Sequence, residues 1–378
     1  MDRIHLQEFN AGFDASLPIE RAWTPPASWF TSPEFHEFEQ ANVFDQSWQP
    51  VARVEELSAP GSFRSGVAGR SPWVVVRGQD DQLRAFHNTC RHKGREVVQG
   101  SGSATELVCG YHAWTYDLEG KLRSAPRMAG IADFDRKAMS LPRMALETWG
   151  PWIFINGDPH AAPLSKSVAS MTERLEASGW ERLRFVSRAT WQIECNWKVV
   201  VDNYLDGGYH IPHMHPTLDA QLDMDSYRTE LFDDGSIQSS RSATAADGRI
   251  SYDPGGRIGD EALYMWLFPN FMINRYGPCM DTNRVIPRGP DACEVVYEFF
   301  FMDDEGDEAR QFIAESVAQS AVTQREDIAI CESVQLGLKS ASYDRGRYAP
   351  QVEMGEYHFH RLLAARLDAA LAQRSTSD

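Results

Sequence analysis

The sequence of 378 residues contains few cysteines, few basic side chains relative to acidic ones, and no long apolar run. Six cysteines in this length do not make the dense disulfide framework of a small secreted domain, and they predict a reducing compartment. Lysine and arginine total 37 against 54 acids, a formal charge of −17, which argues against nucleic acid or an anionic membrane as a partner. No apolar run approaches the roughly 18 residues that span a bilayer. We therefore expect a cytoplasmic protein that binds neither membrane nor nucleic acid.

Two familiar sequence signals are also missing. The first 18 residues lack the apolar core of a secretory signal, and they are not the acid-poor type of an organelle transit peptide. No GxGxxG fingerprint follows a predicted strand, which argues against a dinucleotide site within the chain. If this chain carries out redox chemistry, a separate protein must supply its electrons.

The residue composition and the hydrophobic pattern change along the chain. Residues 1–45 are punctuated by prolines and are interpreted as an irregular lead-in that packs on the later domain. Between residues 46 and 158, short β-rich runs alternate with glycine-rich turns, which predicts a small all-β domain. Residues 159–373 combine strand-like runs with helical stretches, including long helices over 308–338 and 358–372. The expected fold class is α+β, with an all-β domain ahead of a larger mixed domain.

Two cysteines and two histidines lie at metal-ligand spacing in the β-rich region. Cys90-x-His92 is followed, after sixteen residues, by Cys109-x-x-His112. A zinc finger usually groups cysteine with cysteine and histidine with histidine. Here each loop supplies one of each, which favours a [2Fe–2S] cluster with both cysteines on one iron and both histidines on the other. A structural zinc ribbon is the alternative.

A second group of candidate ligands lies in residues 202–215 (DNYLDGGYHIPHMH). Two histidines and one carboxylate with open positions are the usual ligands of a mononuclear Fe(II) that activates O2. His210 and His215 would lie about 140° apart on an ideal helix, so the backbone must bend to bring them together. Two glycines and a proline in this stretch weaken a regular helix. His210 is the firmest candidate, His215 is the second, and His213 is the alternative to His215.

The carboxylate of such a triad must come from elsewhere in the chain. The predicted helix over 308–338 is long enough to cross the domain and present one acid inward, and Asp327 is the candidate on it. The helical pattern alone does not distinguish Asp327 from the other acids, and its choice rests on the resemblance described below. Glu326, beside it, is expected to be solvated. The apolar face of this helix is expected to comprise Ile328, Cys331, Val334 and Leu338.

Beyond these motifs, the sequence resembles the Rieske non-haem iron oxygenases over nearly its whole length, and most closely the members that act on quaternary ammonium compounds, such as choline monooxygenase. The resemblance implies an N-terminal Rieske [2Fe–2S] domain and a helix-grip-like catalytic domain with an antiparallel sheet. It also implies that His210, His215 and Asp327 bind the mononuclear Fe(II). The segments that carry it are residues 196–215 (NWKVVVDNYLDGGYHIPHMH), 268–287 (FPNFMINRYGPCMDTNRVIP), 326–348 (EDIAICESVQLGLKSASYDRGRY) and 358–360 (HFH).

The resemblance further implies a catalytic role for Asp206. This carboxylate would link a Rieske histidine of the neighbouring subunit to an iron-ligating histidine, within a head-to-tail homotrimer. Asp202 competes with Asp206 for the role. One more residue separates Asp206 from His210 than in many members of the family, and the extra glycine matches the choline-type members. Lys93 and Gly110 stand where arginine and proline are common, and neither change removes a ligand.

The implied function is a monooxygenase that uses O2 and electrons from a ferredoxin or a flavin-dependent NAD(P)H reductase. We expect a small quaternary ammonium substrate, first of all choline, which would be oxidised to betaine aldehyde hydrate. The alternatives are an oxygenase or demethylase for carnitine, a betaine or an aromatic compound, and a Rieske electron carrier that is not an enzyme. An acidic or aromatic cage favours the ammonium, because aromatic faces bind trimethylammonium groups. One or two contacts are expected from Tyr264, Trp266, Phe268, Phe271 and Tyr276.

Overall fold

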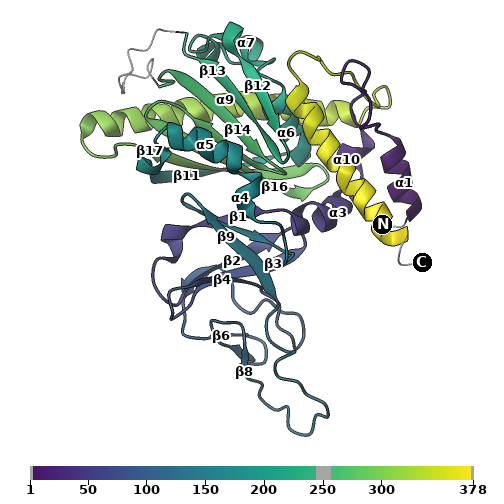
Figure 1. Cartoon of the computed structure of the whole chain (residues 1–378), viewed down its shortest axis with the longest axis vertical. Coiled ribbons are helices and arrows are strands. Elements are labelled where there is room, and N and C mark those ends of the chain that lie inside the picture. The colour runs from purple at the N-terminus through teal and green to yellow at the C-terminus, as the bar shows by residue number, and fades with distance from the viewer. Residues whose placement is uncertain (1–2, 244–256, 376–378) are drawn as a thin grey trace. The chain divides into compact units, whose positions relative to one another are not determined.

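The computed structural model describes residues 3–243 and 257–375, which fold into two compact units (Figure 1). One unit contains residues 39–166, and the other contains the described residues of 1–38 and 167–378. Within the described residues, no helix has both the length and the apolar character needed to cross a membrane.

The unit of residues 39–166 is built from short antiparallel strands. A seven-stranded sheet has the order β1-β10-β9-β4-β3-β2-β5, and a three-stranded sheet has the order β6-β7-β8. Two 3-10 turns, η1 (Phe44–Gln46) and η2 (Val54–Leu57), lie beside the first strand. The strands are β1 (Gln49–Arg53), β2 (Ser62–Ala68), β3 (Ser71–Arg77), β4 (Leu83–His87), β5 (Ser101–Ser103), β6 (Leu107–Val108), β7 (Thr115–Tyr116), β8 (Leu122–Ser124), β9 (Arg143–Trp149) and β10 (Trp152–Asn156).

Strand β3 shows why this sequence forms a sheet with both faces covered. Successive side chains of a strand point to opposite faces. Trp73 and Val75 accordingly pack into one hydrophobic cluster, whereas Val74 and Val76 pack into another. The second cluster contains Cys90 and Cys109, so the candidate metal loops are anchored in the core of this unit.

The larger unit contains most of the helices of the chain. Helix α3 (Pro33–Asn42) and helix α4 (Leu164–Ser167) contain the boundaries between the two units. The others are α1 (Arg3–Ala11), α2 (Ser28–Thr31), α5 (Ala169–Ala177), η3 (Trp180–Arg182), α6 (Trp197–Leu205), α7 (Ile211–Met214), α8 (Pro216–Asp219), η4 (Met224–Ser226), α9 (Asp307–Leu338) and α10 (Met354–Ser375).

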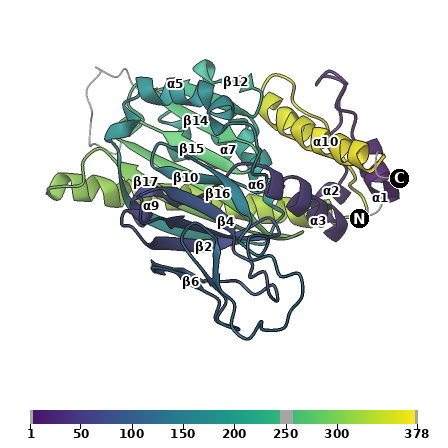
Figure 2. The ribbon, with the colours of Figure 1, turned by 60° about the horizontal axis from the view of Figure 1, so that its bottom comes forward.

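The larger unit is organised around one seven-stranded antiparallel sheet. Its order is β11-β17-β16-β15-β14-β13-β12, so consecutive strands from β12 to β17 are neighbours. Helix α9 runs across these strands, and α6 packs against both α9 and the sheet (Figures 1 and 2). The strands are β11 (Arg184–Ile193), β12 (Arg228–Phe232), β13 (Gly235–Arg241), β14 (Glu261–Leu267), β15 (Phe271–Arg275), β16 (Cys279–Gly289) and β17 (Ala292–Phe301). The expected α+β class with an antiparallel sheet in the second unit is confirmed.

Helix α9 differs from its expected packing in one respect. Its bounds agree with the predicted helix over 308–338. The expected apolar face was wrong at Val334, which is 44% exposed, whereas Gln335 is buried. Gln335 is buried because its side-chain oxygen accepts a hydrogen bond of 2.8 Å from the Asn196 backbone amide. A helix face that meets a helix start can bury a polar side chain, which an apolar pattern does not predict.

Candidate functional site

The metal-ligand segment begins where helix α6 ends. The Asn196 side chain caps the start of α6 by accepting a hydrogen bond of 3.0 Å from the Lys198 amide. The helix stops at Leu205, and Gly207 and Gly208 follow with φ of 72° and 74°. Residues with side chains rarely adopt these angles, so the two glycines turn the chain sharply into the histidine segment. The expectation that these glycines interrupt the helix agrees with the end of α6 at Leu205.

Gly207 has no room for a side chain. A Cβ atom there would lie 2.1 Å from the Val352 carbonyl oxygen. We expect Gly207→Ala to lower the free energy of unfolding by about 1–3 kcal/mol, because the substitution adds left-handed strain to a backbone clash. Thermal unfolding followed by circular dichroism measures this. Gly337→Ala is the control, because outside the local helix backbone no atom lies within 4 Å of its Cβ position. Equal melting temperatures for the two variants would contradict the account of this turn.

Three of the predicted ligands come together at one point of the larger unit. Donor atoms of His210, His215 and Asp327 lie within 4.8 Å of one another. The Nε2 atom of His215 is 3.0 Å from Asp327 Oδ1, and the Nε2 atom of His210 is 3.8 Å from the same oxygen. His213 is exposed and is not part of this group. The structure thus brings the predicted segments together, although α9 begins more than 90 residues after the histidines.

A carboxylate also holds the other nitrogen of each histidine. Asp206 Oδ2 is 2.6 Å from His210 Nδ1, and Glu326 Oε2 is 2.7 Å from His215 Nδ1. Glu326, which was expected to be solvated, is 35% exposed, and its contact with His215 was not predicted. When Nδ1 donates its hydrogen to a carboxylate, Nε2 presents a lone pair, which is the usual arrangement of metal-bound histidine. The donor set of two imidazoles and one carboxylate, each imidazole held in this way, fits a mononuclear iron.

The electrostatics of His215 agree with a site that holds positive charge. Burial lowers the pKa of His215, but the carboxylates of Asp327 and Glu326 outweigh burial and raise the pKa above its ordinary value. The imidazole is only 2% exposed and lies between two acids. A metal cation at Nε2 would compensate the same negative charge.

Glu326 is therefore a positioning residue with a testable effect. We expect Glu326→Gln to lower the affinity for mononuclear iron by about 10–100-fold, because the amide holds the imidazole hydrogen less strongly than a carboxylate does. Iron titration of the apo mononuclear site, with the cluster intact, measures this affinity. Glu332→Gln, six residues later in α9, is the control. An unchanged affinity in Glu326→Gln would contradict the role of this carboxylate.

The second candidate metal site lies in two loops of the unit of residues 39–166. Cys90 and Cys109 are buried, and the rings of His92 and His112 lie with centroids 4.6 Å apart. The backbone amide of Ala113 donates to the Cys109 carbonyl over 3.0 Å, and Ala113 has a φ of 54°, so the second loop is tightly turned. The four predicted ligands are thus gathered at the tips of two loops.

The fit of a two-iron cluster at this site can be judged from the donors. The Nδ1 atom of His92 is buried without a hydrogen-bond partner in the described structure, which suits a nitrogen that binds metal. A single tetrahedral zinc would hold its donors about 3.3–3.8 Å apart, given its bond lengths. Among the described residues, no three of these four have donor atoms within 4.8 Å. Separated pairs fit a [2Fe–2S] rhomb better than one zinc ion.

A buried group of tyrosines lies next to the three converging ligands. Tyr264 packs between Tyr227 and Tyr276, with ring centroids 6.3 Å and 5.9 Å away. The same hydrophobic cluster contains Ile211, the neighbour of His210. Burial raises the pKa of Tyr297, and the charges of Asp281 and Asp327 raise it further, so this side chain lies near both acids.

The five aromatic candidates for substrate contact lie in different parts of the larger unit. Tyr264 and Tyr276 belong to the buried cluster beside the ligands. Trp266 and Phe268 instead pack toward Phe359 of α10, with ring centroids 5.4 Å and 6.4 Å from it. Phe271 is a buried residue of β15. The first two remain candidates for substrate contact.

Two charged side chains that sequence patterns did not indicate are buried against these tyrosines. The side chains of Asp281 and Arg257 are 4% and 6% exposed, and their charged atoms lie 3.5 Å apart. Burial raises the pKa of Asp281 to about 6, although Arg257 and a hydrogen bond from Asn274 lower it. The guanidinium of Arg257 also lies 4.5 Å from the centre of the Tyr276 ring. A single acid and a single arginine in separate segments carry no spacing signal, so the sequence alone could not reveal this pair.

Comparison with protein families finds a match for each of the two parts of the chain. Residues 47–135 match the Rieske [2Fe-2S] domain, and residues 180–369 match the ring hydroxylating alpha subunit (catalytic domain). The chain belongs to the Rieske non-haem iron oxygenases, as a catalytic alpha subunit. It is an O2-dependent oxidoreductase whose cofactors are a Rieske [2Fe–2S] cluster and a mononuclear iron.

The chain is also similar to individual members of this family. The chain is 41% identical to the chloroplastic choline monooxygenase of Arabidopsis thaliana, covering 93% of this chain and 84% of the relative. It is 32% identical to the carnitine monooxygenase oxygenase subunit of Escherichia coli K12, covering 91% and 94%. A solved quaternary ammonium Rieske monooxygenase studied for carnitine oxidation superimposes with a TM-score of 0.79 at 29% identity, covering 95% and 98%.

Proposed function

We propose that this chain hydroxylates a small quaternary ammonium compound, and that choline is its main substrate. The observation that carries the proposal is the buried tyrosine cluster beside the converging ligands, with Asp281 against it. Aromatic faces and a desolvated carboxylate both attract an ammonium cation, whereas an arene gains nothing from the acid. The relatives named for choline support the same choice.

The proposed reaction consumes two electrons, which another protein must supply. Choline, O2, two electrons and two protons give betaine aldehyde hydrate and one water, and the hydrate then loses water to form the aldehyde. When bound, the cluster delivers single electrons and the mononuclear iron activates O2. His210, His215 and Asp327 would hold that iron, and Cys90, His92, Cys109 and His112 would hold the cluster.

The protein's own groups have distinct tasks in this scheme. Tyr264 and Tyr276 would enclose the trimethylammonium group and keep bulk water from the reacting carbon. Asp206 holds the Nδ1 hydrogen of His210 and would accept a second hydrogen bond from a Rieske histidine of a neighbouring copy. That bridge would carry the electron between subunits.

The assembly and the electron donor are also part of the proposal. We infer a head-to-tail homotrimer, because the proposed Asp206 bridge needs a histidine from a second copy. A ferredoxin or a flavin-dependent NAD(P)H reductase would reduce the cluster. The cytoplasm is the proposed location, and the six free cysteines fit such a reducing compartment. Light scattering of the purified chain and fractionation of cells that express it test these two points.

Carnitine is the second candidate substrate, and Arg257 is the reason. This buried guanidinium has an Nε atom without a hydrogen-bond partner among the described residues. A substrate carboxylate could take up that donor, as charge-assisted hydrogen bonds to arginine are strong. Choline has no carboxylate, so the two substrates place opposite demands on the Asp281–Arg257 pair.

A substrate panel separates these candidates. Choline, carnitine, glycine betaine and an arene are supplied with a surrogate reductase while O2 uptake and product are followed. We expect the highest kcat/KM with choline. Uptake coupled to product only with the arene would overturn the ammonium proposal, and a clear preference for carnitine would transfer it to the second candidate.

The pH dependence of KM tests Asp281 in particular. Because its pKa is raised to about 6, this acid is charged above pH 6 and neutral below it. Protonation leaves the positive charge of Arg257 uncompensated, which repels the ammonium. We expect the KM for choline to rise as pH falls through about 6, and Asp281→Asn to show a KM at least about 10-fold higher that no longer changes in this range. A KM that stays flat in the natural protein would contradict the role of Asp281.

A further inference from the structure

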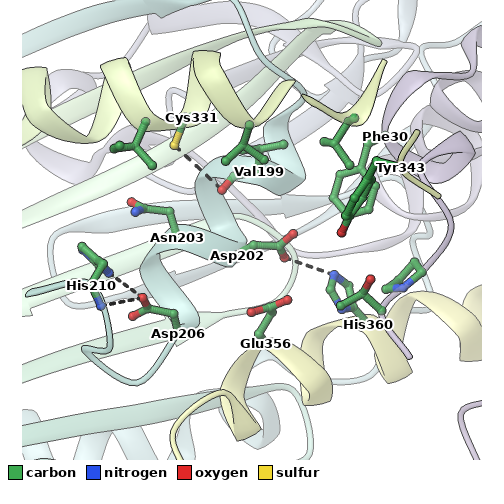
Figure 3. A pocket seen from close by; sticks show the side chains of 15 residues that line it. Phe30, Val199, Asp202, Asn203, Asp206, His210, Cys331, Tyr343, Glu356 and His360 are labelled. Carbon is green, nitrogen blue, oxygen red and sulfur yellow. Dashed lines mark hydrogen bonds and ion pairs between the residues drawn. The ribbon is translucent and has the colours of Figure 1, made fainter. Parts of the chain in front are cut away.

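A further group of potential metal ligands converges between helices α6 and α10. Asp202 comes from α6, and Glu356 and His360 come from α10. One donor atom of each lies within 4.8 Å of the other two. In Figure 3 the two carboxylates and the imidazole face a common space, separate from the His210 side of the cavity. This group shares no residue with the ligands assigned to the cluster or to the mononuclear iron.

The buried atoms of this group are not satisfied by one another. Asp202 Oδ1 and His360 Nε2 lie 3.1 Å apart as an ion pair, yet neither atom makes a hydrogen bond within the described structure. The His360 side chain is only 1% exposed. Leaving a buried imidazole nitrogen and a carboxylate oxygen without hydrogen bonds is costly. A buried nitrogen without a hydrogen bond, within 4.8 Å of two carboxylates, is what a metal ligand presents before the ion binds.

The other side of the His360 ring is held in place. Its Nδ1 atom lies 2.8 Å from the Tyr348 hydroxyl oxygen. If Nδ1 carries the hydrogen and donates it to this oxygen, Nε2 keeps a free lone pair on the side of the ring where the two acids lie. Metal-bound histidines are commonly fixed in this tautomer by a partner on the opposite nitrogen.

The charge around the site favours a cation. Burial raises the pKa of Glu356 well above its ordinary value, and the nearby charges of Asp202, Glu353 and Asp206 raise it further. The three ligands line a cavity of about 260 Å³, which leaves room for water ligands beside an ion. A dication would relieve the repulsion between the carboxylates and use both unsatisfied atoms.

We propose that Asp202, Glu356 and His360 form an additional metal site, which takes one divalent first-row transition-metal ion. Two carboxylates and one imidazole suit ions such as Zn²⁺ or Mn²⁺, with water completing the coordination. The ion would link α6 to α10, on the segment of α6 that leads to Asp206 and His210. It is distinct from the three irons of the oxygenase and does not depend on the identity of the substrate.

The test is zinc binding by the iron-loaded holoenzyme. Zn²⁺ alone is added, unbound metal is removed, and zinc and iron per chain are counted by mass spectrometry. We expect one zinc per chain with all iron retained, and a melting temperature that rises with Zn²⁺ because the ion binds the folded state. In Asp202→Asn and Glu356→Gln, the zinc dissociation constant should rise at least about 10-fold and the thermal effect should disappear.

Matched variants keep the result interpretable. Glu308→Gln removes one exposed acid from the far end of α9 and should bind zinc like the natural chain. Circular dichroism and the iron count check that each variant is folded, and Glu356→Gln decides the matter if Asp202→Asn does not fold, because Glu356 is only partly buried. Absence of bound zinc, zinc gained only as iron is lost, or equal affinity in Glu356→Gln and Glu308→Gln would each overturn the proposal.

Discussion

Asp206→Asn is expected to slow substrate hydroxylation at least about 100-fold while both metal centres remain loaded. The amide oxygen of asparagine can still accept a hydrogen bond from His210 Nδ1, which Asp206 now meets over 2.6 Å, so iron should stay bound. The lost negative charge, however, removes the group proposed to couple the two centres. Stopped-flow reoxidation of the reduced cluster, in the presence of substrate and O2, measures the effect directly.

Two further variants make the Asp206 result specific. Asp225→Asn removes an exposed acid of η4 and should leave reoxidation unchanged. Asp202→Asn tests the other acid considered for this role, which points toward His360 rather than His210 (Figure 3). If Asp206→Asn reoxidises at the natural rate while Asp202→Asn does not, the electron route has been assigned to the wrong carboxylate.

His215→Ala is expected to lower the iron content from three atoms per chain to two and to abolish hydroxylation. Two irons belong to the cluster, and the third belongs to the mononuclear site of the catalytic domain. His215 is buried between Asp327 and Glu326, so no exposed neighbour can replace its nitrogen without moving the backbone. Iron analysis together with the visible spectrum of the cluster shows which centre is lost.

His213→Ala is the matched control for this prediction. His213 lies two residues away and is exposed, so its removal should leave three irons and full activity. The reverse pattern, with iron lost only from His213→Ala, would exchange the two ligands. Loss of the cluster spectrum in His215→Ala would instead indicate that the variant is misfolded.

The sequence predicted best those features in which residues a few positions apart form one local structure. Cys90-x-His92 and Cys109-x-x-His112 each define a single loop, so their spacing directly constrains which atoms can meet. Gly207 similarly marks a sharp turn, because only a residue without a side chain fits against the Val352 carbonyl. The resemblance to a family added Asp327, which no local pattern distinguishes from the other acids of α9.

The remaining features depend on contacts between distant segments. The contact of Glu326 with His215 could not be predicted, because the rotation of α9 about its axis decides which adjacent acids reach the histidine. Gln335 is buried through a hydrogen bond to the start of α6, against its polarity. Arg257 and Asp281 meet only when the β16 strand and the segment before β14 are folded together. Such pairings are set by the tertiary fold and leave no periodic signal.

The most direct test of quaternary ammonium hydroxylation by this chain is a single turnover without any reductase. The purified chain, with its cluster and mononuclear iron reduced, holds the two electrons that one hydroxylation needs. It is mixed with choline and O2, and betaine aldehyde is quantified per chain. We predict close to one aldehyde per fully loaded chain, and none from His215→Ala. Reduced, fully loaded enzyme that forms no product from choline or carnitine, yet hydroxylates an arene, would contradict a quaternary ammonium monooxygenase.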